Sequence, residues 1–83
     1  MLETLVKDLD YVTQSLPGFG GFSVYYTFWN GDEEVVTIEE LPSRKILVYT
    51  EDTNLYEGKD PEEAVFRAKA HYTIKCLTVD SDN

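Results

Sequence analysis

The sequence predicts an α+β fold, in which a three-stranded antiparallel sheet is flanked by an N-terminal and a C-terminal helix (α-β-β-β-α). Three observations lead to this prediction. Apolar residues recur at helical spacing near the N-terminus, β-branched and aromatic residues alternate over the middle of the chain, and a strong helix start follows them. The 83 residues suffice for one domain, so residues 1–83 are expected to form a single small acidic α+β domain.

The N-terminal segment is predicted to be a helix over residues 2–16. Its leucines and valines recur every three or four positions, which places them on one face and leaves the charged residues toward water. Residues 17–21 (PGFGG) end this helix, because proline cannot continue it and glycine permits a tight exit. This glycine run is not expected to bind phosphate, since a phosphate loop follows a strand and opens a helix.

The next two segments predict a β-hairpin. Residues 22–29 form the first strand, a turn at residues 30–32 (NGD) follows, and a second strand runs from Glu33 to Leu41. Alternation divides the first strand into two faces. One face carries Phe22, Val24, Tyr26 and Phe28, and the other carries Ser23, Tyr25, Thr27 and Trp29.

The length of the hairpin loop decides which residues of the second strand join the core. A two-residue loop would place odd-numbered residues such as Val35 opposite the Phe28 face. A three-residue loop with Gly31 in the left-handed conformation places the even-numbered residues there instead. We prefer the second register because it brings two β-branched residues to the core side. It sets Val36 and Ile38 against Tyr26 and Val24.

A third strand is predicted from Lys45 to Glu51, and residues 52–59 are predicted to be a polar loop. Ile46 and Val48 would face the helices, whereas Leu47 and Tyr49 would join Tyr25 and Trp29 on the opposite face of the sheet. That second face is unusually apolar for a surface exposed to water. A covering N-terminal helix, a dimer partner or a bound protein would each explain it.

A second helix begins at a strong signal. Asp60 is placed as an N-cap, Pro61 occupies the first helical position, and Glu63 is spaced to close a capping box. The helix is expected to reach about Tyr72. Its continuation to Leu77 stays open, because residues 72–79 also suit an extra C-terminal strand. Two apolar stripes follow it, one for the sheet and one for the first helix or a second subunit. They are Val65-Ala68-Tyr72-Cys76 and Phe66-Ala70-Ile74-Leu77.

The sequence predicts no catalytic, cofactor or metal site, so we expect a non-enzymatic protein. Cys76 is the single cysteine, and it can form neither an internal disulfide nor, by itself, a thiolate zinc site. On a helix, His71 and Cys76 point roughly 140° apart, which excludes a nucleophile–base pair. No apolar run approaches the roughly 20 residues of a membrane span, and no signal-peptide pattern opens the chain, so a cytoplasmic location is expected.

Sixteen acids against seven bases give a net charge of −9. This charge disfavours direct binding to nucleic acid or to an anionic membrane and favours a basic protein partner. Carboxylates spread over a small sheet can imitate the phosphates of a nucleic acid and occupy a basic groove. The predicted partner-binding residues are Asp32, Glu33, Glu34, Glu39, Glu40, Glu51 and Asp52, with Tyr25 and Trp29 as aromatic anchors.

Residues 57–64 (EGKDPEEA) enter the second helix and resemble the Gly-x-Thr/Asp-x-Glu-Glu-Ala signature of HicB-type antitoxins. The same stretch resembles the closing helix of small phage proteins with α-β-β-β-α order. The HicB resemblance implies a βββα unit that sequesters a small basic toxin. The chain differs from that family in its additional N-terminal helix and in residues 52–59, which lack the usual Pro-Gly-Cys turn.

The sequence therefore predicts a protein-binding inhibitor, encoded by a phage or mobile element, whose acidic face blocks a nucleic-acid-handling partner. A CRISPR effector, a nuclease and a transcription protein are the kinds of partner that such a face would fit. The alternative is an antitoxin-like or structural subunit, including a homodimer, that associates through the apolar faces of its helix and sheet.

Overall fold

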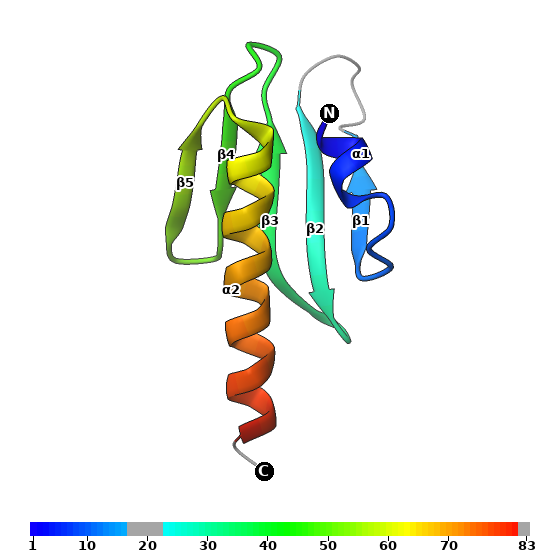
Figure 1. Ribbon diagram of the computed structural model, residues 1–83, viewed down its shortest axis with the longest axis vertical. Coiled ribbons are helices and arrows are strands. Elements are labelled where there is room, and N and C mark those ends of the chain that lie inside the picture. The colour runs from blue at the N-terminus through cyan, green and yellow to red at the C-terminus, as the bar shows by residue number, and fades with distance from the viewer. Residues whose placement is uncertain (17–22, 82–83) are drawn as a thin grey trace.

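The computed structural model describes residues 1–16 and 23–81, which form two helices and a five-stranded antiparallel sheet (Figure 1). The elements are α1 (Leu2–Val6), β1 (Val12–Ser15), β2 (Val24–Asn30), β3 (Glu33–Glu40), β4 (Ile46–Tyr49), β5 (Asn54–Gly58) and α2 (Pro61–Ser81). Strands that are consecutive in the chain are neighbours in the sheet, in the order β1-β2-β3-β4-β5. The α+β class is confirmed, but the sheet has five strands and not three. The predicted turn at residues 17–21 lies outside the described residues.

The predicted helix over residues 2–16 is wrong beyond Val6. Leu2 and Val6 are buried on α1, but the backbone then turns more tightly, with the Leu9 N–H donating to the Val6 carbonyl at 3.0 Å. Residues 12–15 instead pair with β2, where Val12 lies opposite Phe28. A helix, a turn and a strand can all bring apolar residues at this spacing to one core. Because Val12 and Thr13 are β-branched, pairing with the exposed edge of β2 satisfies their backbone better than a longer helix would.

The predicted polar loop over residues 52–59 is also wrong, because residues 54–58 form β5. The chain reverses between β4 and β5 through a turn in which the Thr50 hydroxyl accepts hydrogen bonds from the N–H groups of Asp52 (3.4 Å) and Thr53 (3.1 Å). Tyr56 then pairs with Val48 and packs against the core. The local side-chain bonds of a Thr-x-Asp-Thr sequence therefore build a hairpin turn in a segment whose composition is typical of a loop.

The β2–β3 hairpin confirms the predicted face but not the predicted pairing. Phe28 pairs with Val36, and the ladder shifts between Phe28 and Trp29, so that Trp29 pairs with Glu34. Val35 is the extra residue of this bulge and is buried, as is Val36. The turn contains Gly31 in the left-handed region (φ 65°), as expected. A two-residue loop and a bulge thus replace the predicted three-residue loop. The pairs from Val24 to Phe28 are therefore shifted by two residues relative to the prediction, and those of Trp29 and Asn30 by one.

Both helices pack on the same face of the sheet, and we call it the covered face (Figure 1). Its core consists of buried residues of β2, β3 and β4, together with Leu2 and Val6 of α1 and with Ala64, Val65 and Ala68 of α2. The α2 stripe that includes Val65 and Ala68 therefore faces the sheet. The helix continues to Ser81, so the predicted extra strand over residues 72–79 does not form.

Two contacts of Tyr72 hold the middle of α2 against the end of β2 and against the residue before β1. The Tyr72 ring stacks on the Tyr11 ring with centroids 4.5 Å apart and an angle of 3° between the planes. The Tyr72 hydroxyl donates to the Trp29 carbonyl at 2.7 Å. These contacts come after the last buried residues of the helix, Val65 and Ala68, and fix its direction across the sheet.

The start of α2 confirms the predicted N-cap but not the capping box. One Asp60 carboxylate oxygen accepts hydrogen bonds from the N–H groups of Glu62 (3.0 Å) and Glu63 (3.4 Å). The Asp60 N–H donates to the Tyr56 hydroxyl at 3.1 Å rather than to Glu63. Glu63 instead pairs with Arg67 one turn further along the helix, at 2.6 Å.

Candidate functional site

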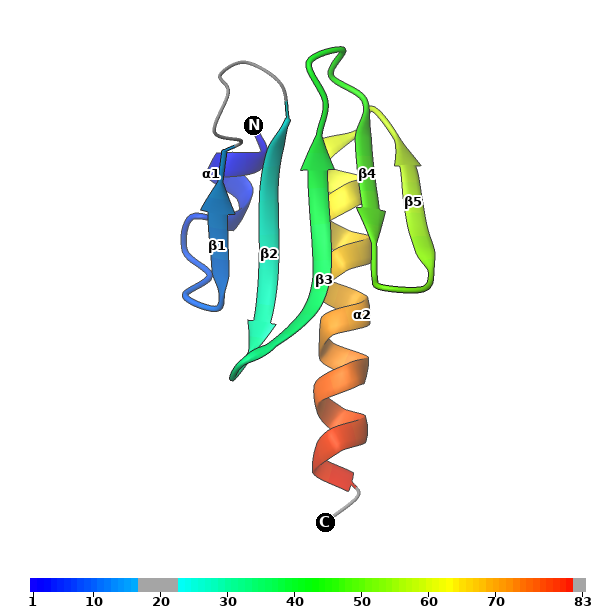
Figure 2. The same ribbon diagram turned by 180° about the vertical axis from the view of Figure 1, so that it is seen from behind.

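The opposite side of the sheet carries no described helix or strand, and we call it the open face (Figure 2). Strand register and alternation assign its residues. They are Thr13, Ser15, Tyr25, Thr27, Trp29, Glu34, Thr37, Glu39, Leu47, Tyr49 and Glu57. The prediction that Tyr25, Trp29, Leu47 and Tyr49 share this side is confirmed. The first helix does not cover them, because α1 lies with α2 on the covered face (Figure 1).

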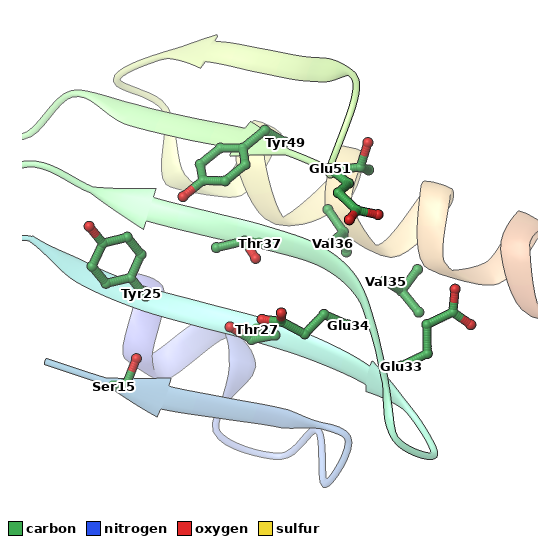
Figure 3. Close-up of a pocket in the computed structure, with 11 residues that line it drawn as sticks. Ser15, Tyr25, Thr27, Glu33, Glu34, Val35, Val36, Thr37, Tyr49 and Glu51 are labelled. Atoms are coloured by element: carbon green, nitrogen blue, oxygen red, sulfur yellow. The ribbon is translucent and has the colours of Figure 1, made fainter.

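The open face contains a concavity of about 550 Å³, drawn in Figure 3. It has an aromatic end, where Tyr25 and Tyr49 stand above the sheet, and an acidic end, where Glu34 and Glu51 lie. Thr27 and Thr37, which pair with each other across β2 and β3, form the floor together with their neighbours. The Glu34 side chain extends over the sheet toward Thr27, whereas Glu33 points away at the sheet end (Figure 3).

The acidic end is built by two turns that are distant in sequence. The β2–β3 and β4–β5 turns lie at the same end of the sheet (Figure 2), because the chain reverses at each turn of an antiparallel meander and every second turn therefore returns to the same end. Glu33 and Glu34 begin β3 directly after the first turn, Glu51 lies in the second turn, and all three line the concavity. Asp32 and Asp52 are exposed in the same two turns. The structure thus brings together five of the seven predicted acids.

The other two predicted acids occupy different faces. Glu39 is half-buried on the open face, where one of its carboxylate oxygens accepts a hydrogen bond from the Tyr49 hydroxyl at 3.1 Å. Glu40 pairs with Val24 and Ile46 and therefore points to the covered face. It belongs to the far end of the sheet and does not join the acidic end of the concavity.

The two predicted aromatic anchors lie on the open face but differ in role. Tyr25 lines the concavity, whereas Trp29 does not. The Trp29 indole N–H donates to the Thr13 hydroxyl at 2.8 Å and so links β2 to β1. Sequence reasoning missed Tyr49 and Thr27 as site residues, although alternation had placed both on this face. What it lacked was the register, which sets Tyr49 opposite Thr37 and Thr37 opposite Thr27.

Tyr49 is held in its neutral form. Burial raises the pKa of Tyr49 to about 12, and the negative charge of Glu39 and the hydrogen bond to it add to this effect. The bond to Glu39 also fixes the orientation of the ring at the aromatic end. The concavity therefore presents a neutral phenol ring beside carboxylates at every pH at which the protein is ordinarily studied.

Charge is divided between the two faces. Among the bases, Lys45 belongs to the open side and pairs with Glu57, whereas Arg67 on α2 pairs with Glu63. Where side chains are described, neither Glu34 nor Glu51 has an ion-pair or hydrogen-bond partner. The concavity is therefore a region of uncompensated negative potential.

The covered side carries a second concavity, an apolar groove of about 610 Å³ along α2. We call it the α2 groove. Phe66 and Ala70 line it from α2 and Leu5 from α1. Phe66 is 65% exposed and Ile74 is 63% exposed. This is the second apolar stripe that the sequence predicted, and the sheet does not use it.

The described residues contain no group of three or more His, Cys, Asp or Glu side chains that could hold a metal ion. Among the described helices, none combines the length and apolar character that a membrane span requires. No protein-family model, curated protein or solved structure matches the chain. The functional interpretation therefore depends on the geometry of the two surfaces.

Proposed function

We propose that the protein is a non-enzymatic inhibitor that uses its open face to occupy the nucleic-acid-binding surface of a basic partner protein. One observation carries the proposal: two turns distant in sequence bring unpaired carboxylates to one end of an uncovered sheet that also bears half-buried aromatic residues. Carboxylates steer and orient a basic partner, and exposed aromatic rings supply the apolar contact area that hot spots require.

The distribution of charge supports a basic partner. Glu33, Glu34 and Glu51 line the open-face concavity without a base among the lining residues, while Arg67, Lys69 and Lys75 belong to α2, which packs on the opposite side of the sheet. A nucleic acid would be repelled by this face, whereas a groove lined by lysine and arginine would be attracted. Small inhibitors encoded by phages and mobile elements are the class of protein that this size and charge suit, and nucleases, CRISPR effectors and transcription proteins are the partners that present such grooves.

The test is capture of the partner from a lysate of the source organism or of its host, with washes at low and high salt and elution by duplex DNA. We expect a basic nucleic-acid-binding protein that is released by salt and displaced by DNA, because both compete for the same electrostatic contacts. The triple variant Glu33→Gln, Glu34→Gln, Glu51→Gln should lose this protein.

A matched control removes the same charge from the other side of the molecule. The triple variant Glu3→Gln, Asp8→Asn, Asp10→Asn changes three exposed acids around α1 and should retain the captured protein. Equal loss in both triple variants would show that only the net charge matters. A captured protein that withstands high salt and is not displaced by DNA would contradict the proposal.

A second candidate function is supported by the α2 groove: an antitoxin-like or structural subunit that associates with a second copy of itself. In an antiparallel pairing centred on Ala70, Phe66 of one helix meets Ile74 of the other, so that small and large residues alternate across a two-fold axis. The acidic first turn of α2 would then approach the half that carries Lys69 and Lys75. Sedimentation of the Phe66→Glu variant tests it, since a dimer built on this groove should become a monomer.

A further inference from the structure

We propose that the concavity of the open face is a receptor for a single arginine side chain of the partner, whose guanidinium lies between the carboxylates of the acidic end and the tyrosine rings of the aromatic end. This inference rests on the proposed function and identifies the group that the face recognises. Three features of the described residues carry it: two carboxylates, the unbonded hydroxyl of Thr27 and two aromatic rings, all of which line the same space.

The carboxylates supply the charge. Glu34 and Glu51 approach the acidic end from different turns, and Figure 3 shows both side chains directed over the concavity. Neither has a partner among the described side chains, so both are available to a cation. A guanidinium presents five N–H donors in a planar fork and can bond two carboxylates at once, which a single ammonium does with less geometric specificity.

The Thr27 hydroxyl points to a bound donor. Thr27 is only 8% exposed although it lies on the uncovered side of the sheet, because Tyr25, Trp29 and the neighbouring strands surround it. It lines the concavity, and no described group hydrogen-bonds its hydroxyl. The hydroxyl keeps access to the concavity, since the described residues contain no buried side-chain oxygen or nitrogen without a partner. An N–H donor that enters the concavity would take the place of the water that satisfies this hydroxyl in the free protein.

The tyrosines favour arginine over lysine. Tyr25 and Tyr49 stand at the aromatic end, and the bond from Tyr49 to Glu39 fixes one of the rings. Guanidinium stacks on aromatic faces and is less strongly hydrated than ammonium, so it loses less on entering a partly desolvated space. The volume of about 550 Å³ lies within the roughly 300–1,000 Å³ range of ligand pockets and accommodates an extended side chain with water.

The experiment is an NMR titration of the ¹⁵N-labelled full chain at low salt with three capped tripeptides, Gly-Arg-Gly, Gly-Lys-Gly and Gly-citrulline-Gly. We expect the arginine peptide to give saturable shifts of the Thr27 and Thr37 amides with millimolar affinity. The lysine peptide should bind at least about threefold more weakly, and the uncharged citrulline peptide should give no saturable shifts. Equal binding of the arginine and lysine peptides, or shifts spread over all acidic segments, would overturn the proposal.

Two variants test the site itself. Thr27→Val keeps the size and β-branched shape of the side chain and removes the hydroxyl, and Glu34→Gln removes one charge at an exposed position. Each should weaken the arginine peptide by about threefold to tenfold, while Thr4→Val on α1 should leave it unchanged. A folded Thr27→Val protein and a folded Glu34→Gln protein that both bind the peptide normally would exclude this site.

Capture of the partner separates this inference from the proposed function. If the arginine peptide does not bind but the charge-dependent, DNA-displaced partner is still captured, the arginine receptor is wrong and the inhibitor function stands. If the peptide binds at Thr27 and no such partner is captured, the receptor is supported and its assignment to an inhibitor is wrong.

Discussion

The covered and open faces of the sheet are built from alternate residues of the same strands, yet they differ in burial and in composition. Phe28 on the covered face is completely buried, whereas its neighbour Trp29 on the open face is half-exposed. The covered face is aliphatic and aromatic without charge at its centre. The open face combines tyrosine, threonine and glutamate. Folding explains the first composition, because α1 and α2 cover it. It does not explain why half-buried aromatic rings lie beside unpaired carboxylates, and this difference is the reason that we propose the open face as the binding surface.

The largest effect is expected from a truncation on the covered face. Phe28→Ala removes a ring that contacts the rings of Tyr11 and Tyr72, with centroids 5.9 Å away in both cases. The cavity and the lost burial should lower the free energy of unfolding by about 3–5 kcal/mol. Urea denaturation followed by far-ultraviolet circular dichroism measures this loss.

The matched change on the open face is Glu34→Gln, which keeps the size of the side chain. It should leave the free energy of unfolding within about 0.5 kcal/mol of the wild type, although it weakens the arginine peptide. Comparable destabilisation by the two substitutions would remove the distinction between a face that holds the fold and a face that binds.

A smaller effect is expected where α2 contacts the end of β2. Tyr72→Phe keeps the ring stacked on Tyr11 but leaves the Trp29 carbonyl without its 2.7 Å hydrogen bond. The free energy of unfolding should fall by about 0.5–1.5 kcal/mol. Hydrogen exchange should show the loss of protection in the second half of α2 and at the end of β2. A loss confined to α1 would mean that this bond does not hold the helix.

Alternation and capping signals were sufficient to predict the two strands of the central hairpin and their core face, β4 and the start of α2, although not the pairing of the hairpin. The β-branched and aromatic residues around Phe28 and Val36 suit only one side of a half-buried sheet, and Asp60-Pro61 suits only a helix start. The division of Tyr25 and Tyr49 from Ile46 and Val48 followed from the same period of two. These signals are local, so the sequence carries them without reference to the rest of the chain.

The two outer strands could not be predicted because their pairing is not local. Val12 has a helical spacing to Leu5 and Leu9, and only the free edge of β2 favours a strand there. Residues 54–58 have a polar composition and become β5 because the Thr50 turn returns them to β4. The acidic end of the concavity has the same origin. Glu34 and Glu51 meet only once all the strands are in order, so the sequence identified the acids but not their convergence.

The acids of the open face should cost a little stability through mutual repulsion. In the triple variant Glu33→Gln, Glu34→Gln, Glu51→Gln, the free energy of unfolding should rise by no more than about 0.5 kcal/mol at low salt. The gain should disappear at high salt, because screening removes the repulsion in the wild type as well. Denaturation at two salt concentrations measures it. A loss of stability would show that these carboxylates support the fold, which would contradict their assignment to binding alone.

The smallest effect is a pH dependence that belongs to the open face. Burial and Glu39 raise the pKa of Tyr49 from 10.0 to about 12. The folded state therefore holds this proton more tightly than the unfolded state, so its contribution to stability is complete below pH 10 and is lost as the pH rises through about 12. Tyr49→Phe should reduce the loss of stability between pH 10 and 12 relative to the wild type and should change the stability little at pH 8.

Glu39→Gln, which removes the nearby charge, should lower the pH midpoint at which Tyr49 ionises in an absorbance titration at 295 nm. The Tyr49→Phe variant identifies the part of the absorbance change that belongs to Tyr49. An unchanged Tyr49 midpoint in Glu39→Gln would show that Tyr49 does not lie against Glu39, and the aromatic end of the concavity would then lose its fixed ring.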